Sequence, residues 1–338
     1  MSPQAASNKK SIVRIHLVNG NAKALAVDPN ITGDELRAEI VKRLDLTESR
    51  CFFVFEQNGD FERCLDPDDK PVDLMNEWDK AESKKKDVTP KFVFKKKIFL
   101  KDDDKEMADV NAKDLVYLQG VHDVIESVYT CQVQEAIKLA ALQVQATYGD
   151  HNPGIHVAGF LTKSASTNIR SFVPKALWQT KKSNDWEALI LRQHSLLKGI
   201  SKEDAKTEYI STIKQWQLYG TTFFPACRNT GNRNLPSKVI IGVNYEGIVL
   251  LKPKNKEIIS EHLFTEICAW ASGLHSFAFE FGNQSDSQKY AFETRPGLGA
   301  IIASTIQTYI DILVQMLKNV DDDESETNTL STDDIQVG

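Results

Sequence analysis

The stretch ICAWASGLHSFAFEFG, residues 267–282, contains two short β-strand patterns separated by a polar turn. In its second half Phe277, Phe279 and Phe281 alternate with small or charged residues, as the side chains of a half-buried strand do. The three rings share one face of that strand, and we expect this face to pack in a core. Trp270 lies on the preceding strand, where base rates favour a core or half-buried position for a large aromatic residue.

Short apolar runs of the same kind fill residues 221–318. Seven can be counted: TTFFPA, KVIIGV, GIVLL, EIISEHLF, EICAWAS, SFAFEF and KYAFET. A helix is predicted after them, from about Gly299 to Lys318, because Ile302, Ile306, Tyr309 and Leu313 share one helical face. Seven strands closed by one helix is the order of a pleckstrin-homology or phosphotyrosine-binding (PTB) type sandwich. We expect this lobe over residues 220–320.

The two segments before this lobe have different patterns. Residues 11–104 show a hairpin around Asn19-Gly20, a capping box at Thr32-x-x-Glu35 and further strands, which together predict a ubiquitin-like roll. Residues 105–219 show apolar residues at helical spacing and almost no strand pattern. They predict a small helical bundle of the acyl-CoA-binding-protein-like kind. The expected fold class is therefore α+β with three lobes.

Charge is unevenly distributed along the chain. The whole chain of 338 residues has a net charge of −6, but residues 321–338 hold seven acids and no Lys or Arg. The rest is therefore close to neutral, at −6 + 7 = +1. We predict disorder for residues 1–10 and for this acidic tail, and hypothesise that the tail folds back over a basic surface. No stretch reaches the length of an apolar membrane span, and five scattered cysteines indicate reduced thiols, so we expect a cytoplasmic protein.

The sequence contains little that indicates catalysis. Nucleotide-loop, nucleophile-elbow, zinc-protease and kinase motifs are absent, and GLGA at residues 297–300 fits a helix start better than a dinucleotide site. His151 and His156 lie five residues apart across a Pro-Gly loop, and we put a metal site there at about one in twenty. We therefore expect no enzyme activity, no cofactor and no metal. A near-neutral body with an acidic tail also disfavours nucleic acid.

Two basic clusters stand out. The first surrounds a strand of the N-terminal lobe and consists of Lys91, Lys95, Lys96, Lys97 and Lys101. The second lies in the helical lobe, without intervening acids, and consists of Lys163, Arg170, Lys175, Lys181 and Lys182. A solvated face and a surface for acidic phospholipid have roughly even odds for each cluster.

The order of the three lobes resembles the FERM domain, and local sequence makes the chain similar to the talin head. The segments that carry the resemblance are LVYLQGVHDVIES, LAALQVQATYGDHNPGIHVAGFL, SFVPKAL, LYGTTFF, ICAWASGLHSFAFEFG and TIQTYIDILVQMLK. They span about residues 90 to 318, whereas the first lobe matches only in pattern. The talin rod has no counterpart in this sequence. A head-only protein and a piece of a longer chain are both compatible with that, and Met1 and the acidic tail favour the former.

The resemblance implies a membrane–cytoskeleton adaptor, cytoplasmic and peripheral at the plasma membrane or cell cortex. In talins an Asn-Pro-x-Tyr-type segment of an adhesion-receptor tail joins the tryptophan-bearing strand beside the C-terminal helix. The peptide contacts expected by resemblance are Ile267, Cys268, Ala269, Trp270, Ile306 and Leu313. The expected contacts to phosphoinositides and other acidic phospholipids are Lys95, Lys96, Lys97, Lys163, Arg170, Lys175, Lys181 and Lys182. Actin-linked proteins are expected only as indirect partners.

One departure bears on the receptor. Talins carry Lys-Arg before this tryptophan, whereas this chain has Cys268-Ala269. A charged donor is missing where the peptide is expected, which argues for weaker binding of the usual talin ligand. The alternative is a phosphoinositide-targeted scaffold whose third lobe does not bind Asn-Pro-x-Tyr-type peptides.

Overall fold

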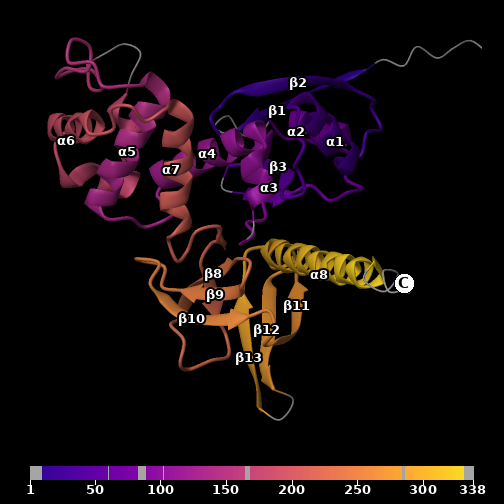
Figure 1. Cartoon of the computed structure of the whole chain (residues 1–338). Coiled ribbons are helices and arrows are strands. Elements are labelled where there is room, and N and C mark those ends of the chain that lie inside the picture. The colour runs from indigo at the N-terminus through magenta and orange to yellow at the C-terminus, as the bar shows by residue number, and fades with distance from the viewer. Residues whose placement is uncertain are drawn as a thin grey trace, which may run out of the picture. The chain divides into compact units, whose positions relative to one another are not determined.

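The computed structural model describes residues 10–59, 61–82, 89–101, 103–163, 168–283 and 286–330, without the side chains of residues 81, 82, 283, 286 and 319–330. The chain forms two compact units (Figure 1). The first comprises residues 1–97 and 102–219, and the second comprises residues 98–101 and 220–338.

The N-terminal lobe of the first unit is a five-stranded sheet with two helices. Its elements are β1 (Ser11–Leu17), β2 (Ala22–Val27), α1 (Gly33–Arg43), β3 (Phe52–Asn58), β4 (Phe61–Cys64), α2 (Pro71–Glu82) and β5 (Lys91–Lys96). The strand order is β2-β1-β5-β3-β4, with β1 and β5 parallel, which is the predicted ubiquitin-like roll. The β1–β2 turn needs the positive φ of Gly20, +86°. Both hydrogen bonds of the Thr32–Glu35 capping box are present.

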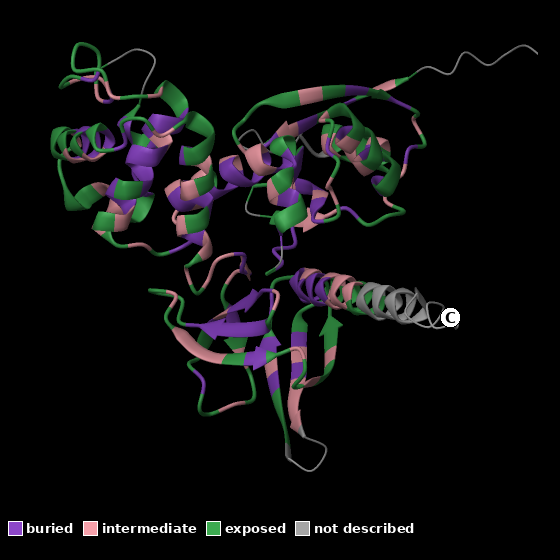
Figure 2. Cartoon of the chain, in the orientation of Figure 1, coloured by how far each residue is buried: buried purple, intermediate pink, exposed green. Residues whose placement is uncertain are grey.

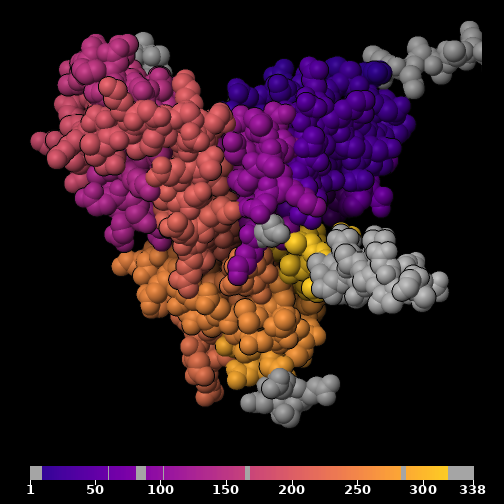
Figure 3. Space-filling model, viewed as in Figure 1, coloured from indigo at the N-terminus to yellow at the C-terminus, as the bar shows by residue number. Residues whose placement is uncertain are grey.

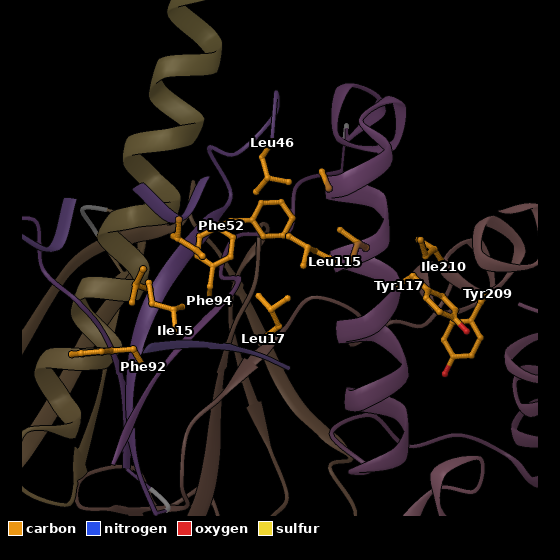
Figure 4. Close-up of a cluster of buried hydrophobic side chains, with 14 of the residues drawn as sticks. Ile15, Leu17, Leu46, Phe52, Phe92, Phe94, Leu115, Tyr117, Tyr209 and Ile210 are labelled. Atoms are coloured by element: carbon orange, nitrogen blue, oxygen red, sulfur yellow. The ribbon is translucent and has the colours of Figure 1, made fainter. Parts of the chain in front are cut away.

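The second lobe of the first unit is the predicted helical bundle. Its elements are α3 (Asp104–Ala108), α4 (Val110–Ile125), α5 (Val133–Tyr148), η1 (Ile169–Ser171), η2 (Lys175–Thr180), α6 (Ser183–Ser195) and α7 (Lys202–Lys214), where η1 and η2 are 3-10 helices. One hydrophobic cluster joins it to the roll. Figure 4 shows Phe52 and Phe94 of the sheet in this cluster together with Tyr117 of α4 and Tyr209 of α7.

The second unit is the predicted PTB-like sandwich with its C-terminal helix. Its strands are β6 (Thr222–Phe223), β7 (Cys227–Asn229), β8 (Lys238–Val243), β9 (Gly247–Leu251), β10 (Ile258–Leu263), β11 (Ile267–Gly273), β12 (Ser276–Asn283) and β13 (Asp286–Glu293). The order is β10-β9-β8-β7-β13-β12-β11, and β6 pairs with β8. The first predicted strand is thus continued as two short pieces, with Pro225, which has no N–H to donate, between them. The predicted fold class is confirmed.

Helix α8 (Leu298–Leu330) is longer than expected. It was expected to end near Lys318, but no Gly or Pro follows that residue before Leu330, so no residue type that breaks helices interrupts it. The first ten residues of the expected disordered tail therefore have helical backbone, and residues 331–338, like residues 1–9, lie outside the described part of the chain.

The first part of α8, Leu298–Lys318, is long and apolar enough by length and composition to cross a membrane, contrary to the expectation that no stretch has this character. The core helix of a globular lobe can have the same composition. Ile302, Ile306 and Tyr309 are fully buried within the second unit. Figure 2 shows the helix changing from buried to exposed along its length.

Residues 98–101 pack with the second unit rather than with the strand they follow. The backbone N–H of Phe99 donates to the Tyr309 hydroxyl at 3.3 Å, and that hydroxyl also donates to the Gly220 carbonyl at 3.3 Å. Gly220 has a positive φ of +72°, and a Cβ at this position would lie 2.4 Å from Cβ of Phe99. These contacts tie the short connecting segment to the base of α8.

Candidate functional site

Strand β11 forms one edge of the second unit's sheet. It pairs with β12, and no other described strand of that unit pairs with its opposite side. Trp270 lies opposite Phe279 in the antiparallel register, so its side chain lies on the same face as that buried ring. The tryptophan is nevertheless only half-buried, because no further strand covers it at the edge. The residue combines a core-facing direction with access from solvent.

The residues before Trp270 sit at an irregularity in β11. Ile267 pairs with Phe281 and Ala269 with Glu280, so Cys268 is the extra residue of a register shift. The Cys268 thiol is exposed and donates to the Gly282 carbonyl at 3.1 Å. Ala269 is exposed and Ile267 is half-buried. Four of the residues expected to contact a peptide thus lie in sequence along one accessible, uncharged edge.

Helix α8 packs beside this edge, against β11 and β12 (Figure 1). Gly299 allows the close approach, because a Cβ there would lie 2.2 Å from the Ser276 carbonyl oxygen. Leu313 is half-buried, and Val314 and Leu317 expose 42% and 67% of their surfaces. The later turns of α8 therefore offer apolar side chains that the lobe only partly covers.

Ile306 is a wrong prediction as a peptide contact. It is fully buried, on the part of α8 that lies in the core of the second unit. Ile306 and Leu313 are two helical turns apart and share a face by periodicity. The sequence does not show where along that face the buried part of α8 ends. In the structure it ends between Ile306 and Leu313.

The lysines of the N-terminal lobe also differ from expectation. Lys96 is 2% exposed and forms a 2.6 Å ion pair with Glu106, and Lys97 is buried with its ammonium 5.3 Å from the centre of the Phe53 ring. Lys95 is half-buried and forms a 2.6 Å ion pair with Glu62. Lys96 and Lys97 are therefore wrong predictions as lipid contacts, because their charges are directed inward, and the charge of Lys95 is already paired.

The cations of the helical lobe are exposed, as a lipid-facing surface requires. Lys163 is exposed in the loop that follows α5, and Lys181 and Lys182 are exposed directly after η2. Arg170 of η1 stacks on Trp178 of η2, with its guanidinium 5.0 Å from the ring centre. Lys175 forms an exposed 2.5 Å ion pair with Glu126, which reduces its availability. The structure thus brings Arg170 to η2, whose C-terminal cap is Lys181.

The two loop histidines belong to a cluster of three imidazoles. The rings of His151 and His156 lie 5.5 and 5.0 Å from the ring of His194 on α6, a residue that sequence reasoning missed because it lies far along the chain. His194 Nε2 lies 2.9 Å from both the Gln145 side-chain oxygen and the Gly149 carbonyl. Burial lowers the pKa of His156 and of His194. No group of three or more ligands suited to a metal ion occurs in the described part of the chain.

Three family models match the chain in succession. They are an RA-like domain at residues 9–98, a FERM central domain at residues 102–224 and an IRS-1 type PTB domain at residues 225–314.

Similar proteins give the same result. A talin from Oscarella pearsei is 25% identical over 97% of this chain, and FERM domain-containing protein B from Dictyostelium discoideum is 34% identical over 55% of it. The chain spans only 13% and 38% of these two relatives. The FERM and C-terminal domain complex of Drosophila merlin has the same fold, with a TM-score of 0.74, 17% identity, and coverage of 91% of this chain and 98% of that one. With its RA-like, central and PTB-like regions in order, this chain belongs to the FERM-domain family and resembles the talin head.

Proposed function

We propose that this chain is a FERM-type adaptor at the cell cortex that binds an extended segment of a transmembrane receptor's cytoplasmic tail along β11. The observation that carries the proposal is the free edge of β11 with α8 beside it. An edge strand offers unpaired backbone groups to an incoming peptide, and adjacent side chains select its sequence. Trp270 and Leu313, both half-buried, are the proposed apolar contacts.

The proposed peptide partner is of the Asn-Pro-x-Tyr type, as in talins. Three exposed residues on this edge, Cys268, Ala269 and Ala271, carry no charge. Affinity therefore comes from backbone hydrogen bonds and apolar contacts, without a charged donor from positions 268 and 269. Links to actin are proposed to be indirect.

Isothermal titration calorimetry with an Asn-Pro-x-Tyr-containing receptor-tail peptide tests this site. Trp270→Ala is expected to weaken binding at least several-fold, because it removes the half-buried ring on the accessible edge. Trp178→Ala is the matched control, since it removes a half-buried tryptophan from the helical lobe and leaves β11 intact. Absence of binding by the wild-type chain, or an equal loss in both variants, contradicts the proposal.

The charge at the edge gives a second measurement. Cys268→Lys combined with Ala269→Arg introduces the two cations that talins carry before the tryptophan. We expect this double variant to bind a peptide with acidic flanking residues more tightly, and more so at low salt, because both positions are exposed. Unchanged affinity at low salt would show that the peptide does not pass these positions.

The lipid part of the proposal rests on the helical lobe. Lys163, Arg170, Lys181 and Lys182 are exposed in a segment without acids, and each cation near an anionic bilayer contributes about 1 kcal/mol. We propose that this surface binds acidic phospholipids, including phosphoinositides. The uncharged edge of β11 favours a second candidate, a phosphoinositide-targeted scaffold without peptide binding. Under it, Lys175→Glu, Lys181→Glu and Lys182→Glu together abolish sedimentation with phosphoinositide vesicles, and Trp270→Ala has no effect on this sedimentation.

A further inference from the structure

An exposed apolar patch lies at the end of α5 and in the loop that follows it. Tyr148, Ile155 and Val157 expose 37%, 57% and 51% of their surfaces, and we call these three residues the loop patch. Figure 3 shows the magenta part of the chain, near residue 150, on the outer surface of the helical lobe. Exposed apolar side chains that gather in one place mark an interaction surface more often than single ones do.

The loop holds these side chains outward through a buried residue between two of them. His156 is 7% exposed, and its Nδ1 accepts a hydrogen bond from the backbone N–H of Asn152 at 2.8 Å. His156 is buried whereas its two neighbours in sequence, Ile155 and Val157, are exposed, so the loop directs both apolar side chains to the surface. The Phe160 ring makes edge contacts with Tyr148 and His156, at 5.0 and 4.7 Å between ring centres. These contacts join the helix end and the loop into one surface.

The C-terminal part of the loop is fixed by a buried carboxylate. Glu187 of α6 is 3% exposed and accepts hydrogen bonds from the backbone N–H groups of Gly159 at 2.9 Å and Leu161 at 2.6 Å. The hydroxyl of Thr162 also donates to it, at 2.9 Å. The loop backbone is therefore anchored on both sides of the patch, and the exposure of Ile155 and Val157 is part of the folded structure.

The charged side chains in the chain segment that contains the loop are all positive. Residues 151–182 contain Lys163, Arg170, Lys175, Lys181 and Lys182 and neither Asp nor Glu. Lys163 is exposed, and its aliphatic stem lies against Gly159, with Cδ 3.3 Å from where a Cβ would be. Asp150 is the acid adjacent to the loop, and it accepts hydrogen bonds from Gln145 and from the Gly199 N–H. Apolar side chains with a tyrosine and a snorkelling lysine form the residue set of a membrane interface.

We infer that the loop patch inserts into the headgroup region of an acidic phospholipid bilayer, with Lys163 at the phosphates. The inference rests on the lipid part of the proposed function and adds to it an apolar contact that the cations alone do not supply. A bilayer fits better than a protein partner, because three side chains fall far short of the roughly 800 Å² that a stable protein interface covers on each partner. A bilayer also needs no matching shape.

The test is sedimentation of the full chain with vesicles of phosphatidylcholine containing about one fifth phosphatidylserine. The patch variant is Ile155→Gln with Val157→Gln. We expect it to lower vesicle affinity roughly tenfold, because only about half of each apolar side chain is exposed and can move from water into the bilayer. Val110→Gln is the matched control, since Val110 lies on α4 in the same unit and is 61% exposed. Equal thermal unfolding midpoints of all three proteins are required.

Lys181→Glu with Lys182→Glu separates the inference from the function it rests on. If the wild-type chain binds and this charge variant does not, but the patch variant binds like the control, the inference is wrong and the lipid function stands. If the wild-type chain does not bind at all, both fail. Sedimentation velocity covers the protein alternative: a wild-type dimer that only the patch variant dissociates makes the loop patch a protein interface and overturns the inference.

Discussion

At the scale of single residues, the aromatic side chains of β11 and β12 differ in how far the sheet covers them. Phe277 and Phe279 are buried as expected, whereas Phe281 is half-buried near the end of the same strand. Trp270 shares their face by register and stays accessible because β11 is the edge strand. Edge position depends on the order of strands in the sheet, which alternation within one strand cannot show.

The N-terminal lysines show the same limit for charge. The run of lysines around β5 was expected to face solvent, yet Lys96 pairs with Glu106, ten residues later and in a different lobe. The sequence pattern shows on which face of a strand a lysine lies, but it does not show whether a carboxylate from another lobe pairs with that lysine. The face that β5 turns toward the helical lobe is buried by that lobe, and a buried cation needs a carboxylate.

Lys96→Met is expected to lower the free energy of unfolding by about 3 kcal/mol, because it leaves the Glu106 carboxylate buried without its partner. Urea denaturation of the full chain measures this. Lys95→Met is the control, since its pair with Glu62 is partly exposed and is expected to contribute about 1 kcal/mol or less. Adding Glu106→Leu to Lys96→Met should restore most of the loss. A double variant as unstable as the single one would show that the pair itself is not the cause.

At the scale of elements, the starts of helices were easier to predict than their ends. The Thr32 capping box formed as predicted, because the residues that make it are local in sequence, and Ser201 likewise caps α7 by accepting a hydrogen bond from the Asp204 N–H. The end of α8 was missed because termination depends on a breaker, and none follows Lys318 before Leu330. The predicted helix wall of the peptide site included the buried Ile306 for a similar reason, since the limit of the buried part of α8 depends on the sheet that the helix packs against.

Gly299→Ala is expected to destabilise the second unit by about 1–3 kcal/mol and to weaken peptide binding along β11. The added Cβ would lie 2.2 Å from the Ser276 carbonyl oxygen, so the start of α8 must move away from β12. Thermal unfolding and peptide calorimetry on the same samples measure both effects. Ala300→Ser is the control, because Ala300 is exposed on the next position of the helix. Wild-type behaviour of Gly299→Ala would show that the helix start adjusts without disturbing the edge.

The three imidazoles predict a pH response of the helical lobe. Burial lowers the pKa of His194 below its ordinary 6.5, although the hydrogen bond to Gly149 opposes this shift. The pKa of His156 is also lowered, by burial and by the nearby His151. Their pKa values in the folded chain are thus below those in the unfolded chain, so stability is fully present above pH 6.5 and is lost as the pH falls toward the folded values. Asp150 faces His194 and acts in the opposite direction, but the net shift is downward.

Hydrogen exchange followed by mass spectrometry should therefore show faster exchange in α5 and α6 at about pH 5.5 than at about pH 7.5, after correction for intrinsic rates. His194→Gln should reduce this difference, because it removes one titrating group and keeps an amide that can donate to Gly149. The readout must be specific to these helices, since His262 in the second unit also has a lowered pKa. Equal protection of α5 and α6 at both pH values would exclude the cluster as a pH-sensitive element.

At the scale of the whole molecule, lobe order was the most predictable property and charge placement the least. Three different periodicities in succession indicated three lobes, and the matched models follow the same succession. Of the two basic clusters, the helical-lobe cluster kept its side chains exposed, whereas Lys96 and Lys97 of the other were buried. Both clusters consist of Lys or Arg residues, so composition alone could not show which side chains would be buried by packing within the fold.

Removing residues 321–338 is expected to strengthen binding to acidic vesicles at low salt. The segment carries seven acids and no Lys or Arg, so its loss changes the net charge from −6 to −6 + 7 = +1. Whether or not the segment folds back over the basic surface, its charge repels an anionic bilayer when screening is weak. The gain should disappear near 1 M salt, where the screening length is about 3 Å. A full-length variant with the seven acids changed to Asn or Gln is the matched control, and it should bind like the truncated chain if charge is the cause. If only the truncated chain binds vesicles more tightly, the segment hinders binding sterically rather than by its charge. If neither variant binds more tightly at low salt, an electrostatic role for the segment is refuted.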